Sequence, residues 1–405
     1  MTQPAKSQAD AAPKPARAPA GRSHAGSAPF GGLIDAVIVD EPVLFPFAGS
    51  VGRDAAMAAW VWVSRDLCPE LIPAEKLESG RFGAAELEPL MPDVLAGMTA
   101  ALERVDADGE ALQRLRVQFG RERAREELAV TMAALHARAL LPKAQGFGRA
   151  VNSIGDEAAL GTALQSMPLR DPQMAALLFH AALGQIANPT RLITAVIRLA
   201  GGANEEAVAR NGFSPLLDAY LAHAQNQLCR LNLTGPFADI DLACRSLDRF
   251  HRLARALTGY IEFARTSRST QILSSITRMV SDRVEPRLKE VATDLNQAMR
   301  RPREGHDRID GDRLLGAISG VYLLATVRDC RASLALNAVF DQAWNQTGEA
   351  LELHIQRNLD LLRQNPDDQL TGARLDAAIK MAEVRFNPDY AETLRRARVT
   401  AERRG

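Results

Sequence analysis

The feature that most restricts the fold of this chain is an apolar residue at every third or fourth position, repeated almost to the end from residue 52. This spacing gathers apolar side chains on one face of an α-helix, whereas a strand needs strict alternation. The helix-favouring residues Ala, Leu and Arg are abundant, and aromatic residues make up only 5% of the 405 residues. The pattern predicts an all-α protein of elongated bundles, built from long antiparallel helices.

One segment departs from this helical pattern. Residues 33–47, LIDAVIVDEPVLFPF, are rich in β-branched side chains and contain an Asp-Glu-Pro turn. This composition predicts two short strands, or an extended chain lying across helices. No other part of the sequence has appreciable strand character, so we expect one small extended element in an otherwise helical protein.

Composition also divides the chain into regions. Residues 1–30 are rich in Pro and Ala and contain no apolar core, which predicts a disordered tail and no signal peptide. Residues 31–145 predict an N-terminal helical domain that includes the extended segment, and residues 170–405 predict a C-terminal all-helical domain. The stretch between them, from about residue 142 to 171, has a loop-like composition. A charged stretch at residues 301–311 marks a candidate subdivision.

Capping and breaking signals position individual helices. One helix is predicted over residues 52–67 and a longer one over residues 109–141, with Gly120 weakening its middle. Asp239 and Asp312 are predicted N-caps of two later helices, because an aspartate side chain accepts hydrogen bonds from the free N–H groups of a first turn.

The most apolar window of the chain is LLGAISGVYLLATV, residues 314–327. A helix that crosses a bilayer needs about 20 apolar residues, so this window predicts no transmembrane segment. Gly316 and Gly320 stand four residues apart, a spacing that lets two helices approach closely. The window therefore predicts a central helix that is covered on all sides.

Charge and cysteine content argue against several classes of function. Lys plus Arg and Asp plus Glu both number 49, so the basic excess of a dedicated nucleic-acid binder is missing. The four cysteines are scattered, which favours reduced thiols in a cytoplasmic protein and predicts no metal site. No glycine-rich phosphate loop is present, so no cofactor is expected. The predominance of Ala and Arg favours a bacterial source.

Two residues are candidates for catalysis. Ser50 lies in the sequence AGSVG, residues 48–52, which fits a variant of the motif that exposes a nucleophilic serine between a strand and a helix in hydrolases. His251 stands on a predicted helix beside small residues, as the histidine of phosphotransfer modules does. The lysine and glycine that follow the histidine in those modules are absent here. Hydrolysis at Ser50 and phosphotransfer at His251 are therefore alternatives to the main prediction.

Two tryptophans in the predicted helix over residues 52–67 are candidates for partner binding. Trp60 and Trp62 lie about 200° apart around a helix, so burying both requires cover from two directions. The segment 33–47 is the expected second cover. If Trp62 is exposed, this helix is the first choice for a partner-binding surface.

The C-terminal sequence RRARVTAERRG is the second candidate for partner binding. Its residues Arg395, Arg396 and Arg398 have few acidic neighbours in sequence, which leaves nucleic-acid binding as a further alternative, although the balanced overall charge argues against it. Long amphipathic helices without charge bias favour protein–protein contacts. The sequence thus predicts a non-enzymatic scaffold, adaptor or regulatory protein that binds protein partners, and it leaves a homo-oligomer open.

Overall fold

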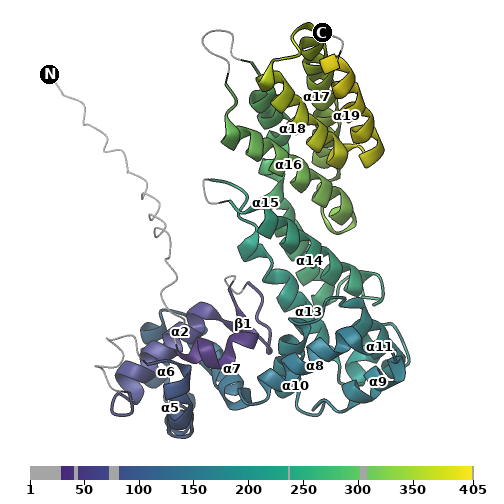
Figure 1. The fold of residues 1–405 in the computed structure, drawn as a ribbon. Coiled ribbons are helices and arrows are strands. Elements are labelled where there is room, and N and C mark those ends of the chain that lie inside the picture. Colours follow the sequence, from purple (N-terminus) through teal and green to yellow (C-terminus); the bar gives the residue numbers. More distant parts are fainter. Residues whose placement is uncertain (1–28, 41–43, 73–81, 236–237, 302–307, 404–405) are drawn as a thin grey trace, which may run out of the picture.

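The computed structural model describes residues 29–40, 44–72, 82–235, 238–301 and 308–403, and most of them lie in helices (Figure 1). The chain forms an L, in which the N-terminal helices build the lower arm and the C-terminal helices rise from one end of it. The predicted all-α class is confirmed. The predicted tail, residues 1–30, lies outside the described residues except for Pro29 and Phe30, which begin a helix.

The lower arm consists of short and medium helices. They are α1 (Pro29–Ile34), α2 (Arg53–Trp62), α4 (Ala84–Leu87), α5 (Met91–Ala107), α6 (Gly109–Phe119), α7 (Ala124–Ala137), α8 (Leu141–Ser153), α9 (Glu157–Gln165), α10 (Pro172–Leu183), α11 (Thr190–Ala200), α12 (Glu205–Arg210) and α13 (Ser214–Gln225). Shorter helical turns join them: η1 (Asp35–Val37), η2 (Val63–Leu67), η3 (Glu88–Leu90) and η4 (Leu228–Arg230).

The stem and the far bundle contain the longest helices. These are α14 (Ile240–Thr258), α15 (Arg268–Met299), α16 (Gly311–Cys330), α17 (Asn337–Gln364), α18 (Gln369–Arg385) and α19 (Pro388–Arg403), with the turn η5 (Arg331–Ser333) after α16. At 1.5 Å per residue, the 32 residues of α15 extend over about 48 Å. This helix therefore carries the chain from the lower arm to the far bundle (Figure 1).

The extended segment is smaller than its sequence predicts. Strand β1 (Ile38–Val39) pairs in parallel with β2 (Val51–Gly52), and these two strands are the only sheet among the described residues. Residues 33–37 are helical instead, in α1 and η1. The reason is that Phe30, Ile34 and Val37 follow one another at helical spacing, and a helical turn buries all three completely.

Several predicted helix ends agree with the structure and one does not. The helix over residues 52–67 is α2 continued by η2, and the Asp239 side chain accepts from the Leu242 N–H at the start of α14. The cap of α16, however, is Asp310 rather than Asp312, because Asp310 directly precedes the first turn and accepts from the Arg313 N–H.

Glycine acts in two different ways in the lower arm. The predicted helix 109–141 is divided into α6 and α7, because Gly120 adopts a left-handed conformation (φ 65°) that ends α6. The stretch 142–171, predicted to be loop-like, instead carries α8 and α9. There Gly148 lies inside α8, where a Cβ atom would stand 2.1 Å from the carbonyl oxygen of Ala182. Its glycine thus marks a close helix contact.

Helix α10 lies where two hydrophobic clusters meet. Every residue from Ala175 to Leu183 is buried. Leu177, Leu178 and Ala181 belong to the cluster formed by α1 to α7, whereas Phe179 and Leu183 belong to the cluster that continues through the stem to the far bundle. A helix that is buried on all sides has apolar residues on every face. Helix α10, rather than α16, has this character.

Candidate functional site

Both tryptophans of α2 are core residues, with only 8% of each exposed. The Trp60 ring packs edge-on against Phe30, with centroids 5.2 Å apart, and stacks on Phe82 at 6.0 Å. Trp62 packs edge-on against Phe119 of α6 at 6.0 Å. The second cover therefore comes from α6 and not from the predicted extended segment. The indole rings support the lower arm and leave little surface for a partner.

Ser50 lies before β2, whereas a serine of the hydrolase motif lies between a strand and a helix. Its hydroxyl is buried and contacts the carbonyl oxygen of Phe47 at 3.4 Å. The hollow of about 60 Å³ beside it is lined by arginines and glutamates, and by no histidine among the described residues. The hydrogen bond of this hydroxyl thus goes to a backbone carbonyl oxygen, and not to the histidine that the hydrolase motif pairs with its serine.

His251 joins two elements of the stem. Its Nδ1 atom lies 2.9 Å from the hydroxyl of Ser333 in η5, so one ring nitrogen is occupied by a contact within the chain. Burial lowers the pKa of this imidazole. A phosphotransfer histidine must present its ring to a partner protein, whereas the contact with Ser333 is typical of a histidine that connects two helical segments.

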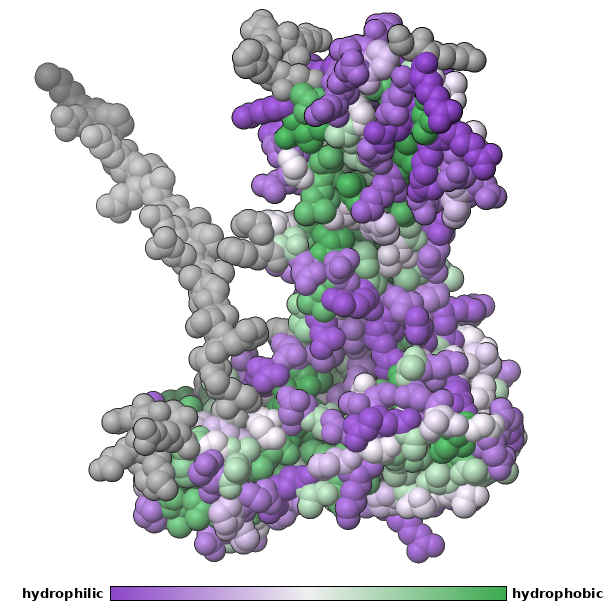
Figure 2. Space-filling model, viewed as in Figure 1, coloured by the Kyte–Doolittle hydropathy of each residue, from purple (hydrophilic) through white to green (hydrophobic). Residues whose placement is uncertain are grey.

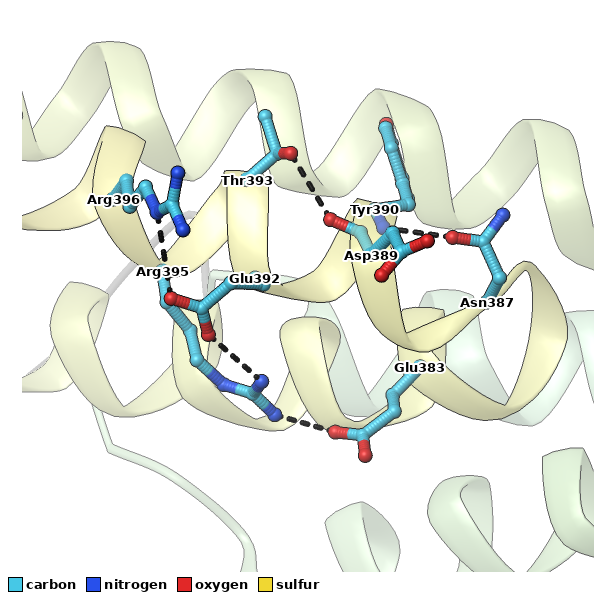
Figure 3. Close-up of polar contacts among 8 residues, drawn as sticks. All are labelled: Glu383, Asn387, Asp389, Tyr390, Glu392, Thr393, Arg395 and Arg396. Atoms are coloured by element: carbon cyan, nitrogen blue, oxygen red, sulfur yellow. Dashed lines mark hydrogen bonds and ion pairs between the residues drawn. The ribbon is translucent and has the colours of Figure 1, made fainter.

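The C-terminal arginines lie beside acidic side chains, some of which belong to the preceding helix α18 (Figure 3). The ion pairs join Arg395 to Glu383 and Glu392, Arg396 to Glu392, and Arg398 to Asp376 and Glu402. Glu383 and Asp376 belong to α18, which packs antiparallel to α19. Since each of the three charges is balanced locally, this surface offers little attraction for a nucleic-acid backbone.

Helix α16 has one face that is not covered, contrary to the sequence prediction. Leu315 is 63% exposed and Tyr322 is 44% exposed, and Ile318 between them is partly buried. Figure 2 shows hydrophobic surface where the molecule narrows between the stem and the far bundle. Gly320 faces α15, where a Cβ atom would meet Arg287 at 3.2 Å, but Gly316 has open space beside it. We call Leu315, Ile318 and Tyr322 the α16 stripe.

A polar cavity of about 410 Å³, here called the central cavity, lies where the lower arm meets the stem. It is lined by residues of η1, β1, α8, α10, α13, η4 and α14. The charged and aromatic side chains in its wall are Asp35, His180, His223, Arg230, Arg245 and Arg249. It thus brings together residues more than 200 positions apart in the sequence.

Two stacked histidines form one wall of the central cavity. The rings of His180 and His223 lie with centroids 4.1 Å apart, and His223 Nε2 lies 2.8 Å from the carbonyl oxygen of His180. That contact requires His223 Nε2 to carry its proton, since a carbonyl oxygen only accepts. His180 is 2% exposed, and its Nδ1 atom has no hydrogen-bond partner among the described residues.

Burial keeps both rings neutral near pH 7. It holds the pKa of His180 well below the usual range, and the neighbouring His223 adds to this effect. Burial likewise lowers the pKa of His223 to about 4, and Arg249 and Arg230 oppose its protonation. The histidines therefore contribute hydrogen-bonding groups rather than positive charge.

The three arginines of the central cavity differ in their contacts. Arg249 donates to the carbonyl oxygens of Ile186 and Leu183 at 2.7 and 2.8 Å, which ties α14 to the end of α10. Arg230 and Arg245 are exposed at the rim and have no side-chain hydrogen bond or ion pair in the described part of the chain. Two guanidinium groups thus face the cavity without a carboxylate partner.

The sequence prediction missed this cavity, although one signal was present. His180 is a single ionisable residue within the apolar sequence QMAALLFHAALG, residues 173–184. Nothing local identified Arg245, because Asp241 and Asp248 stand one turn away on either side and suggest ordinary pairing. In the structure Asp248 binds Arg252 instead, at 2.8 Å.

Neither a metal site nor a membrane-spanning helix is found within the described residues. No group of three or more His, Cys, Asp or Glu side chains there is placed to hold a metal ion. None of the helices in the described ranges combines the length and the apolar character that spanning a bilayer requires.

Comparison with protein families, with curated proteins and with solved structures finds no match to this chain.

Proposed function

We propose that this protein is a non-enzymatic helical scaffold or adaptor, and that it binds a protein partner through the α16 stripe. The supporting observation is the exposure of Leu315 and Tyr322 on a helix whose other faces are buried in the stem and the far bundle. Apolar surface left in water costs about 25 cal/mol per Å², and a partner that covers this surface recovers that free energy.

The occupant that best fits the α16 stripe is an amphipathic helix. Leu315, Ile318 and Tyr322 follow at i, i+3 and i+7, the spacing with which one helix presents anchors to another. Each end of α16 carries one acidic and one basic residue, so we expect a partner helix with an apolar centre and no strong net charge.

Photo-crosslinking of the full-length chain tests this proposal. A photoreactive residue replaces Tyr322, the protein is irradiated in an extract of its native host, and products are identified by mass spectrometry. We expect one protein to be crosslinked through a helical segment, and we expect Leu315→Asp to abolish that product, because a charge within the stripe opposes apolar packing.

The matched control is Leu353→Asp on α17. Leu353 is 66% exposed but has Glu349 and Arg357 one turn away on either side, so it belongs to no apolar row. The control variant should retain the crosslink. Equal crosslinking by wild type and Leu315→Asp contradicts the proposal. A crosslinked product that contains two copies of this chain would show that the stripe joins the subunits of a homo-oligomer, which also contradicts the adaptor proposal.

A further inference from the structure

We infer that the central cavity binds an organic phosphate. Its volume of about 410 Å³ lies within the range of about 300–1,000 Å³ typical of sites for small organic ligands. This inference goes beyond protein binding at the α16 stripe and does not depend on it, since the two sites share no residue.

The charge of the central cavity matches an anion. Three arginines and one carboxylate, Asp35, line it, and the histidines are neutral, so the sum is three minus one, or two positive charges. A phosphate monoester carries about 1.5 to 2 negative charges at pH 7. Guanidinium groups donate to phosphate oxygens through two parallel N–H groups, which gives strong, oriented hydrogen bonds. Arg230 and Arg245 at the rim are the groups for that contact.

The interior of the central cavity offers hydrogen-bonding groups that suit the uncharged, hydroxylated part of a ligand. His180 lines this interior, and its neutral imidazole can exchange a hydrogen bond with a ligand hydroxyl. The side chains of Gln145, Gln185 and Gln227 add amide donors and acceptors to the same wall. A ligand that joins a phosphate to a hydroxylated body therefore uses the rim and the interior together.

Isothermal titration calorimetry on the full-length chain tests the inference. The probes are glucose 6-phosphate, glycerol 3-phosphate and AMP, with glucose as the uncharged control and inorganic phosphate as the isolated anion. We expect at least one organic phosphate to bind more tightly than inorganic phosphate, and glucose not to bind. Arg245→Gln and Arg230→Gln should each weaken that binding about tenfold or more, because each removes a charge-assisted hydrogen bond.

Two further variants separate the site from general effects. Arg252 also belongs to α14, but it pairs with Asp248 and does not line the cavity. Arg252→Gln should therefore leave the affinity unchanged. His180→Phe keeps the ring stack and the backbone carbonyl that accepts from His223, and it should weaken the organic phosphate while sparing inorganic phosphate. Circular dichroism verifies that each variant is folded.

Three results overturn the inference. One is the absence of heat with every phosphorylated probe at millimolar concentration. Another is equal affinity for wild type and for both rim variants, which places the anion elsewhere. The third is inorganic phosphate binding as tightly as all organic phosphates, which leaves a simple anion site and removes the organic ligand.

Discussion

At the scale of single residues, His180 and His223 show how burial changes what a side chain can do. The two residues are 43 positions apart and belong to different helices, yet their rings stack at 4.1 Å. In water an imidazole with a pKa near 6.5 would take up a proton below neutral pH. In this wall the burial of both rings, with Arg249 and Arg230 nearby, opposes that proton.

We predict that stability falls as the pH falls from about 6.5 towards about 4. The folded-state pKa of His223 is depressed to about 4, so between these values the unfolded chain binds protons that the folded chain excludes. Above pH 6.5 both states are neutral and the full stability is present. Urea unfolding at pH 7.5 and pH 5.0 measures the difference, and His223→Gln should reduce it. The exposed His136→Gln should not, and an equal reduction contradicts this assignment.

At the scale of elements, glycine in α8 sets the distance between two helices. A Cβ atom on Gly148 would stand 2.1 Å from the Ala182 carbonyl oxygen and 3.0 Å from Gln185 Cβ, so α8 can cross α10 this closely only without a side chain there. Two residues earlier, a Cβ on Gly146 would meet nothing nearer than the Arg149 guanidinium at 3.9 Å. The same residue type therefore has opposite consequences on one helix.

We predict that Gly148→Ala destabilises the protein by about 1–3 kcal/mol, because the added methyl overpacks against backbone that cannot move aside. Gly146→Ala should stabilise it by roughly 0.5–1 kcal/mol, since alanine restricts the unfolded chain and favours the helix. Chemical denaturation of the two variants beside wild type measures both changes. Changes of the same sign in both variants would show that the α8–α10 contact is looser than described.

At the scale of the whole molecule, α10 connects the two hydrophobic clusters. Its side chains alternate between the cluster of α1 to α7 and the cluster that extends into the stem. Loss of packing in one cluster therefore displaces α10, whose other side chains are part of the second cluster. Residues forming one packed network unfold together when neither part is stable without the shared element.

We predict that Phe179→Ala lowers the unfolding midpoint of the N-terminal cluster, although Phe179 packs in the other one. The expected cost is about 3–5 kcal/mol for a buried phenylalanine. In a Trp344→Phe background, Trp60 and Trp62 are the only tryptophans, and both lie in the N-terminal cluster, so tryptophan fluorescence reports on that cluster. Their midpoint should fall together with the loss of helical circular dichroism. If the fluorescence midpoint stays unchanged in Phe179→Ala, the two clusters unfold independently and the prediction is wrong.

The helix positions were largely predictable, because apolar spacing and capping residues act within a few positions along the chain. Asp239 is an example, because its side chain caps the first turn of α14. Gly120 and Gly148 were harder, since one residue type ends a helix in one place and brings two helices together in another. The sequence shows the glycine but does not show which distant residue packs against it.

The all-α class and the positions of several helices follow from the amino-acid sequence alone, since local hydrophobic periodicity specifies both. Which helix faces are covered depends on how the helices pack in three dimensions. The tertiary structure buried both tryptophans of α2, paired the C-terminal arginines with acids of α18, and left the α16 stripe open. It also gathered Arg230, Arg245 and His180 around one cavity. These outcomes depend on contacts between distant segments, and a periodic pattern records the presence of an apolar face but not what packs against it.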